Sequence, residues 1–274
     1  MKTAFLLVLT LLFATISCRK EKIGHPDPPS TGVALLKLKD VTVNNLPSPY
    51  YHFEYNDTGN ITLAEFSAGI KSYQVTYAGK DIASMLNTAD PGNNVKLDYV
   101  YNNGDLIAVV VKSMNGDVLR HCIISYSPGQ QLQEIDWDLR DGNIGFYLEQ
   151  SMKFSYYPDG NLMQMVTHNY PVGAQTEATY TDRFENYDDH VNVDAFSLLH
   201  TSPHDLILLP GLKLQLNNPR RVIHTGDGVN FDINYTYSYD AMKRPTSKTG
   251  DVTVTNGSAA GQHYESRTAF SYYN

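Results

Sequence analysis

From residue 33 onward, apolar and polar residues alternate along much of the chain. A period of two is typical of β-strands, because successive side chains of a strand point to opposite faces of a sheet. We therefore expect strands with one aromatic face and one polar face. Four segments show the aromatic face most clearly: Tyr51, Phe53 and Tyr55; Leu97, Tyr99 and Tyr101; Met152, Phe154 and Tyr156; and Ile233, Tyr235, Tyr237 and Tyr239.

Residues that favour tight turns follow many of these strands. Asn-Asp-Thr-Gly-Asn occupies residues 56–60, Asn-Asn-Gly-Asp residues 102–105 and Pro-Asp-Gly-Asn residues 158–161, and an apolar run resumes after each. Gly and Asn tolerate the positive φ that hairpin turns demand. The tyrosines before turns stand at positions 55, 77, 101, 126 and 157, at intervals of 22, 24, 25 and 31 residues. This spacing predicts a degenerate repeat of about one hairpin per unit.

The pattern predicts an all-β fold. Residues 34–274 are expected to form a single domain of consecutive antiparallel hairpins, which make a large curled sheet or an open, barrel-like roll with the tyrosine-rich face inward. Helical patterns are nearly absent, and only residues 81–87 and 193–200 could form short helices. A membrane-spanning barrel fits less well, because its strands need about 9–11 residues with an apolar outward face, and most faces here are mixed.

Residues 1–17 have the features of a lipoprotein signal peptide. Residues 4–16 are apolar except for Thr10 and Thr15, and this length suits a secretory signal but not a spanning helix, which needs about 20 residues. Residues 15–18, Thr-Ile-Ser-Cys, resemble a bacterial lipobox. The resemblance implies cleavage before Cys18, acylation of that cysteine and anchoring in the cell envelope, at the outer membrane. The alternative is an ordinary signal peptide with an incidental cysteine.

The residues after Cys18 predict a tether. Residues 18–33 include His-Pro-Asp-Pro-Pro-Ser-Thr-Gly, and such Pro-rich stretches are extended. With Cys18 bound to lipid, Cys122 has no partner for an intramolecular disulfide. The sequence leaves open whether the domain faces the periplasm or the cell exterior.

Charge and composition limit the partners. The 274 residues include 21 Lys and Arg against 29 Asp and Glu, and 20 tyrosines. An acidic chain offers little counterion release, so we expect no binding to nucleic acid. The chain also has no Gly-x-Ser-x-Gly sequence and no phosphate-binding glycine loop, and we expect no cofactor. The expected membrane contact is the lipid on Cys18.

Two resemblances concern the repeat and the C-terminal half. Residues 53–61 and 154–162 follow the pattern aromatic-x-Tyr-x-x-x-Gly-Asn-hydrophobic, which resembles the tyrosine-aspartate (YD) hairpin repeats of RHS-type wrapping proteins. The Tyr-Asp-Asp-His-Val-Asn block at 187–192, the leucines 198 and 199, the segment 216–219 and the closing hairpin at 235–240 resemble uncharacterised Gram-negative lipoproteins with a porin-like fold. These resemblances imply an envelope location and a curled sheet, without an activity.

One strand carries three carboxylates on one face. Glu134, Asp136 and Asp138 alternate with Ile135 and Trp137, which resembles the Glu-x-Asp-x-Glu strand of retaining β-glucanases. The resemblance implies that Glu134 is the nucleophile and Asp138 the acid. The simpler interpretation is a solvated strand face that discourages edge pairing.

A second group of candidates could bind a metal ion. Asp188, His200 and His204, with Asp189, His190, Asp194 and Asp205 nearby, are residue types that suit zinc. Pro203 interrupts any helix that would place both histidines on one face. No spacing in this group matches a known kind of metal site, so exposed loop residues are the simpler interpretation.

The tyrosines allow two interpretations. Tyrosine on a sheet can stack on a sugar ring or contact a protein, whereas in a repeat of hairpins the same residues form the core. We expect a lipid-anchored envelope protein of unknown activity that binds or scaffolds an extracytoplasmic glycan or envelope protein. The alternative is a glycoside hydrolase that uses Glu134 and Asp138.

Overall fold

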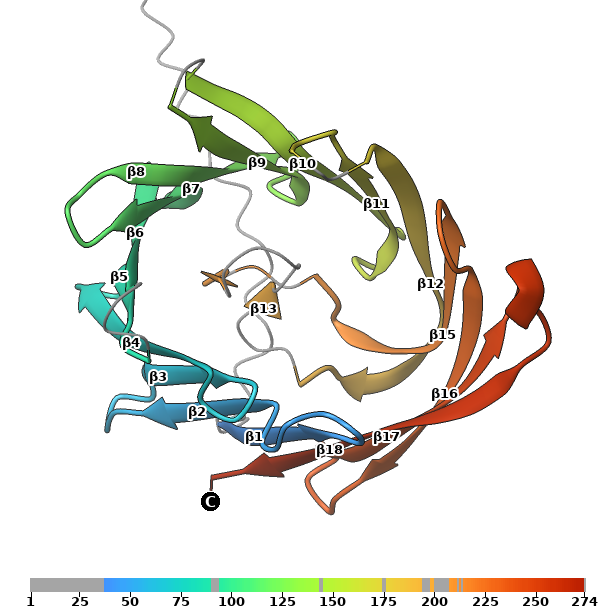
Figure 1. The fold of residues 1–274 in the computed structure, drawn as a ribbon. Helices are drawn as coiled ribbons and strands as arrows, with labels where there is room; N and C mark the ends of the chain where they lie inside the picture. The colour runs from blue at the N-terminus through green and yellow to red at the C-terminus, as the bar shows by residue number, and fades with distance from the viewer. Residues whose placement is uncertain are drawn as a thin grey trace, which may run out of the picture. The chain divides into compact units, whose positions relative to one another are not determined.

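The computed structural model describes residues 37–89, 94–142, 145–173, 176–193, 198–199, 207–210, 212 and 214–273. All of them belong to the unit that spans Leu35–Asn274. Sixteen antiparallel strands of this unit form a closed barrel, and a short pair of strands lies within the ring (Figure 1). The predicted all-β fold of consecutive antiparallel hairpins is confirmed, and the sheet closes completely.

Neighbouring strands of the barrel are consecutive in sequence, with two exceptions. β12 pairs with β15 because the inner pair, β13 and β14, is inserted between them, and β1 pairs with β18 where the ring closes. The strands are β1 (Leu38–Val43), β2 (Tyr51–Tyr55), β3 (Ile61–Phe66), β4 (Lys71–Ala78), β5 (Asp81–Asn87), β6 (Val95–Asn102), β7 (Asp105–Ser113), β8 (Val118–Tyr126), β9 (Leu132–Asp141), β10 (Gly145–Tyr156), β11 (Leu162–Asn169), β12 (Ala178–Val191), β13 (Leu198–Leu199), β14 (Ile207–Leu208), β15 (Asn217–Gly226), β16 (Phe231–Tyr239), β17 (Pro245–Val254) and β18 (His263–Tyr272).

The expected helix at residues 81–87 is wrong, because this segment is strand β5. Seven residues are too few for a helix that is stable by itself, and the backbone here pairs with β4 on one side and β6 on the other. In the second segment, Leu198–Leu199 pairs with β14, and residues 194–197 and 200 lie outside the described residues. The described helix is a single 3₁₀ turn, η1 (Gly257–Ala259). No helix in the described ranges is long and apolar enough to span a membrane.

The predicted aromatic faces point into the barrel. Trp137, Tyr73 and Phe53 are among the fully buried side chains, and full burial of a large apolar side chain contributes about 1.5–3 kcal/mol. Ile207, Leu208 and Leu209 join the same core from within the ring. Further core members from the predicted faces are Leu97, Tyr99, Met152 and Phe154. The core therefore lies between one half of the wall and the inner segment, our name for the described residues between Asn192 and Asn217.

In six strands a β-bulge lies beside a tyrosine that is the last or second-last residue of the strand. The ladder shifts register at Tyr55, Tyr77, Tyr101, Tyr126, Tyr156 and Tyr239. A bulge bends its strand and increases the twist, and curvature repeated in this way allows a sheet to close. The turn repeat expected from the sequence therefore supplies the curvature of the ring.

Tyrosine hydroxyl groups connect neighbouring hairpins. Each donates a hydrogen bond to a backbone carbonyl oxygen at or near the start of the preceding strand, and we call these contacts tyrosine ties. The ties are Tyr55 to Leu38 (2.8 Å), Tyr126 to Leu106 (2.7 Å), Tyr187 to Leu162 (2.6 Å), Tyr237 to Pro219 (3.0 Å) and Tyr272 to Pro245 (2.7 Å). All of them lie at one end of the barrel, the turn rim, which also carries the turns at 56–60, 127–131, 157–161 and 240–244. The opposite end, the loop rim, carries residues 227–230 and 255–262.

The inner segment is held by polar contacts as well as by the core. The backbone N–H of Leu208 donates to the Tyr99 hydroxyl oxygen at 3.0 Å. Asn161, which is buried in the turn between β10 and β11, accepts through Oδ1 from the backbone N–H groups of Leu216 (3.0 Å) and Asn217 (2.9 Å). Gly160 has a positive φ, and a Cβ there would lie 3.0 Å from Leu216 Cδ1. The turn before β11 thus fits closely against the inner segment.

Candidate functional site

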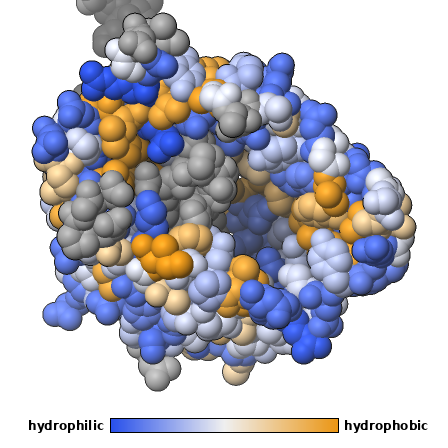
Figure 2. Space-filling model, viewed as in Figure 1, coloured by the Kyte–Doolittle hydropathy of each residue, from blue (hydrophilic) through white to orange (hydrophobic). Residues whose placement is uncertain are grey.

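The inner surface of the barrel has a packed half and a partly open half. Inward side chains of β2–β10 such as Phe53, Met85 and Trp137 are fully buried. On β12 and β15–β18, most inward side chains keep part of their surface exposed, and Tyr264 is 53% exposed. Figure 2 shows a hollow inside the molecule with hydrophilic residues in its depth. We call the inward face of β12 and β15–β18 the open wall.

Aromatic rings line the open wall near the loop rim. The His224 ring stacks on the Phe231 ring, with centroids 4.6 Å apart and planes at 7°. On the other side of β15, the Tyr180 ring of β12 lies with its centroid 5.1 Å from that of the His224 ring. Asp182 Oδ1 is 2.7 Å from His224 Nδ1, and this contact fixes the orientation of the imidazole. The result is a row of rings with a carboxylate behind it.

The middle of the open wall combines a ring with an amine. Lys248 Nζ lies 4.6 Å from the centroid of the Tyr235 ring, a cation–π distance. A Cβ on Gly250 would lie 2.7 Å from Tyr235 Cε1 and 2.8 Å from Ile233 Cγ2. A side chain at position 250 would therefore displace the Tyr235 ring, and the glycine lets this ring lie against the backbone of β17.

Burial changes the ionisation of both groups. It raises the pKa of Tyr235 to about 12, and the carboxylate of Asp182 acts in the same direction. Burial also lowers the pKa of Lys248. The described residues give Lys248 the cation–π contact with Tyr235 and no ion pair. An amine inside the barrel without a carboxylate partner is the least compensated charge of the open wall.

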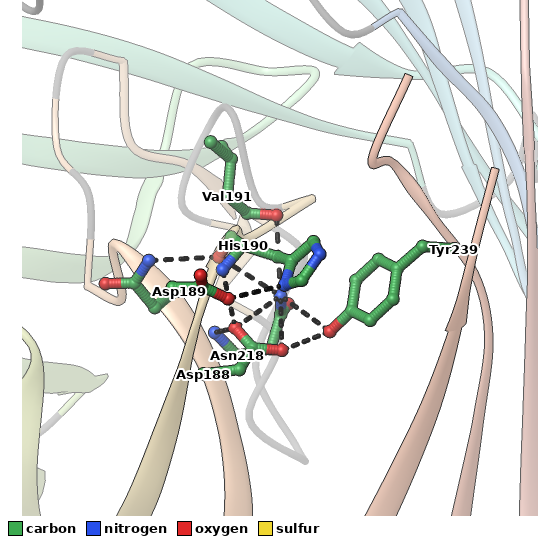
Figure 3. Close-up of polar contacts among 7 residues, drawn as sticks. Asp188, Asp189, His190, Val191, Asn218 and Tyr239 are labelled. Carbon is green, nitrogen blue, oxygen red and sulfur yellow. Dashed lines mark hydrogen bonds and ion pairs between the residues drawn. The ribbon is translucent and has the colours of Figure 1, made fainter. Parts of the chain in front are cut away.

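A compact polar cluster lies at the turn rim, where the inner segment leaves the wall (Figure 3). Asp188 Oδ1 accepts hydrogen bonds from the backbone N–H groups of His190 (3.0 Å) and Asn218 (3.2 Å). Tyr239 donates its hydroxyl to Asp188 Oδ2, and the His190 and Tyr239 rings stack with centroids 4.0 Å apart. Burial and the contact with Asp188 raise the pKa of Tyr239. These contacts join β12, β15 and β16.

Only some of the predicted metal candidates lie among the described residues. Asp188 is bound within the cluster of Figure 3, and Asp189 is exposed beside His190. His200 and His204, like Asp194 and Asp205, lie outside the described residues. Within the described ranges, no three His, Cys, Asp or Glu side chains are grouped so that they could hold a metal ion.

The predicted catalytic carboxylates lie on the outside of β9. Glu134 Oε1 accepts a hydrogen bond from Ser151 at 3.1 Å and lies 3.4 Å from Lys153 Nζ. Asp136 stands opposite Ile123 and Ser151, and Asp138 stands opposite residues 121 and 148. Partial burial and its acidic neighbours raise the pKa of Asp136. The expected alternation holds, because Ile135 and Trp137 are buried on the inward face of the same strand.

The two cysteines differ in what the structure describes. Cys122 is fully buried in the core, where burial raises the pKa of its thiol. A buried thiol with a raised pKa is a poor nucleophile at neutral pH. Cys18 lies outside the described residues.

A groove crosses the outer surface where the ring closes. It has a volume of about 490 Å³ and is lined by residues of β1, β17 and β18, including Asn44, Glu265 and Arg267. Glu265 and Arg267 pair with each other, and Asn44 Oδ1 accepts from the backbone of Arg267 at 2.7 Å. Among the described residues, no aromatic ring lines the groove. The charges of the groove are paired and it lacks aromatic rings. The open wall therefore offers a ligand more contacts than the groove does.

Comparison with known proteins finds a related architecture. The fold is similar to that of a porin-like protein from Bacteroides uniformis. That crystal structure matches with a TM-score of 0.54 and 17% identity, over 81% of this chain and 89% of the other. A Photorhabdus luminescens Tc holotoxin pore matches with a TM-score of 0.33 and 12% identity, over 78% of this chain and 12% of the other. No protein-family model matches, and no curated protein matches at the significance required.

The open wall was not identified from the sequence as distinct from the core. The alternation places Tyr235 and Tyr237 on the same kind of face as Phe53 and Tyr99, although only the latter two are buried. The available signal was Lys248, an amine two residues before Gly250 on an inward strand position. A charge in the aromatic register of a hairpin indicates a face that water reaches.

Proposed function

We propose that the protein is a lipid-anchored binding module of the cell envelope, and that it binds a glycan within the barrel against the open wall. The observation that carries this proposal is the contrast between the two inner halves. One half is packed by the inner segment, whereas rings of Tyr180, Phe231, Tyr235 and Tyr264 remain partly or largely exposed inside the other. Exposed aromatic faces beside hydrogen-bonding groups suit sugar rings, which have apolar faces and polar edges.

Charged side chains on the outward face of the barrel support the proposal that water, and not lipid, surrounds the strands. Asp98 lies 2.8 Å from both Lys96 and Lys112 on the outside of β6 and β7. On the opposite side of the ring, Arg221 pairs with Asp232 and with Glu185. Lysine or arginine at the lipid-facing midplane of a membrane barrel costs about 2–4 kcal/mol. We therefore assign membrane attachment to the acyl chains on Cys18 and not to the strands.

Glycan-array screening of the purified full chain tests the binding proposal. Ser266 lies opposite Gly250 on the open wall and is partly buried, so Ser266→Trp is expected to fill the hollow and abolish binding of any glycan retained by the wild type. Asn234→Trp, on the exposed outward face next to Tyr235, is the matched control and should bind normally. Equal binding by both variants, or no glycan bound by the wild type, contradicts the proposal.

The anchor is tested separately by metabolic labelling with palmitate. Wild-type protein expressed with its complete N-terminus should incorporate the label and sediment with membranes. Cys18→Ser should do neither, whereas Cys122→Ser, which removes the buried cysteine, should behave like the wild type. Labelled Cys18→Ser protein in the membrane fraction would falsify lipidation at this residue.

A further inference from the structure

We propose that the open wall is selective for acidic glycans, and that the Lys248 amine, which lies over the Tyr235 ring, receives a carboxylate of the sugar. This inference rests on the proposed glycan binding and adds the chemical class of the ligand. It concerns a part of the hollow in which a positive charge, an aromatic face and hydroxyl groups lie on adjacent strands.

The first argument is the environment of the amine. Lys248 stands opposite Tyr237 on β16 and Thr268 on β18, and it is partly buried on the inward face. Charged groups inside a protein are almost always paired, because the loss of hydration must be offset. Within the described part of the chain, the amine is offset only by its cation–π contact with the Tyr235 ring. A carboxylate in the hollow would supply the missing pairing.

The second argument is the charge distribution of the open wall. Asp182 is held by His224 at 2.7 Å, and Asp188 by Tyr239 and the backbone of Asn218. Neither carboxylate forms an ion pair with Lys248 in the described ranges. An anionic ligand at Lys248 therefore replaces no existing ion pair, and an interaction with a charged group is stronger than one between neutral groups.

The third argument is the rigidity of the ring beside the amine. The absence of a side chain at Gly250 lets Tyr235 lie against β17, since a Cβ there would meet the ring at 2.7 Å. The Tyr235 and Tyr237 rings lie 6.2 Å apart along β16. A fixed ring of this kind loses little conformational entropy on binding, and its cation–π contact holds Nζ on the inward face of the wall.

Titration calorimetry with two matched trisaccharides tests the inference. Trigalacturonate carries a carboxylate on each ring, whereas α-1,4-galactotriose has a hydroxymethyl group in its place. We expect wild-type full-length protein to bind trigalacturonate more tightly, by about 10- to 100-fold, the range for a hydrogen bond to a charged group. Lys248→Met should lose this preference. Lys153→Met removes an exposed lysine on the outside of β10 and should keep it.

The outcomes distinguish the failure of this inference from the failure of the proposed glycan binding. If the wild type binds both trisaccharides equally, or if Lys248→Met keeps the preference, the selectivity of Lys248 is refuted while glycan binding stands. If neither trisaccharide binds and the array also gives no ligand, the proposed function itself fails.

A second measurement does not depend on the folding of a variant. Acetylation of Lys248 in the wild type, followed by mass spectrometry, should be slowed by trigalacturonate and unaffected by galactotriose. An acetylation rate that trigalacturonate leaves unchanged overturns the inference.

Discussion

At the scale of the residue, tyrosine performs two tasks that phenylalanine cannot combine. Its ring covers the core, and its hydroxyl group reaches a carbonyl oxygen on the adjacent strand, as Tyr126 does with Leu106 at 2.7 Å. These contacts lie beside bulges, where the regular ladder is interrupted. The excess of tyrosine in the composition, 20 residues against 10 phenylalanines, thus has a structural cause in the ties.

Deletion of one hydroxyl group removes the tie at Tyr126. Tyr126→Phe should destabilise the protein by about 1–3 kcal/mol, because the partly buried carbonyl of Leu106 loses its donor. The free energy of unfolding from denaturant titration measures this change. Tyr264→Phe removes a hydroxyl group from an exposed ring and should change the stability by less than about 0.5 kcal/mol. Similar losses in both variants would show that the hydroxyl contact contributes little.

The partly buried tyrosines also make the protein sensitive to alkali. Burial raises the pKa of Tyr126 and Tyr235 to about 12, whereas tyrosine in the unfolded chain ionises near pH 10. Above pH 10 the unfolded state therefore binds fewer protons than the folded state, and stability must fall as pH rises. We expect an unfolding midpoint that is constant between pH 8 and 9 and decreases above pH 10. Native absorbance at 295 nm should show tyrosines that titrate near pH 12, and titration of all 20 near pH 10 would contradict the burial.

At the scale of the element, the inner segment converts half of the barrel into a core. The β14 residues Ile207 and Leu208 are fully buried against the wall, and the turn between β10 and β11 holds the end of the segment through Asn161. The other half keeps its rings exposed to the hollow. The path of this segment therefore determines which tyrosines are structural and which can meet a ligand.

Asn161 can be compared with its counterpart in another repeat. Asn161→Ala leaves the backbone N–H groups of Leu216 and Asn217 without an acceptor, so it should destabilise the protein by about 2–4 kcal/mol. Hydrogen exchange at residues 207–209 should become faster. Asn60→Ala changes the equivalent Gly-Asn position of an exposed turn and should leave exchange at 207–209 unchanged. Undiminished protection in Asn161→Ala would show that the core alone holds the segment.

The hairpins could be predicted from the sequence, whereas the inner segment could not. Alternation around Phe53, Tyr99 and Phe154 and the Gly-Asn turns are local signals, and they define strands whatever the rest of the chain does. The placement of Ile207 inside the ring depends on contacts with strands more than 100 residues away, such as that between Leu208 and Tyr99. Likewise, the exposure of Tyr235 depends on the distance between the wall and the inner segment, which no local pattern encodes.

For the candidate site residues as well, local alternation could be predicted from the sequence but long-range placement could not. The alternation of Glu134, Asp136 and Asp138 with buried neighbours was correctly predicted, but their position on the outside of β9 required the direction in which the sheet curls. Lys248 and Tyr235 are 13 residues apart and meet through the register of β16 and β17. The sequence shows both residues, although it does not show that they face the same hollow.

At the scale of the whole molecule, the barrel is a ring with a single long-range closure. Every other pair of neighbouring strands is a hairpin, except β12 and β15, which are separated in sequence by the inner segment. In contrast, β1 and β18 pair residues from opposite ends of the chain, such as Val41 and Phe270. Closure leaves no free strand edge in the barrel, and free edges invite aggregation. The stability of the ring should depend strongly on this seam.

A disulfide across the seam measures that dependence. Thr42 and Ala269 are paired on the outside of β1 and β18, and Gln74 and Leu86 are paired on the outside of β4 and β5. In the loop-entropy account, cysteines at the seam pair should stabilise by about 5 kcal/mol and cysteines at the hairpin pair by about 3 kcal/mol. Denaturant unfolding of oxidised and reduced protein gives each value. A larger gain from the hairpin crosslink would show that the seam is not the weak point of the ring.

The seam also determines when the protein can finish folding. The hairpins can form one after another as the chain emerges, since their strands are near neighbours in sequence, but β1 must wait for β18. Pairings between residues so distant in sequence are slow to form, and during this interval both strands present open edges to other chains. Folding of this protein therefore includes a period in which the incomplete ring is open to other chains, and the rate of ring closure, more than the stability of any hairpin, determines the length of that period.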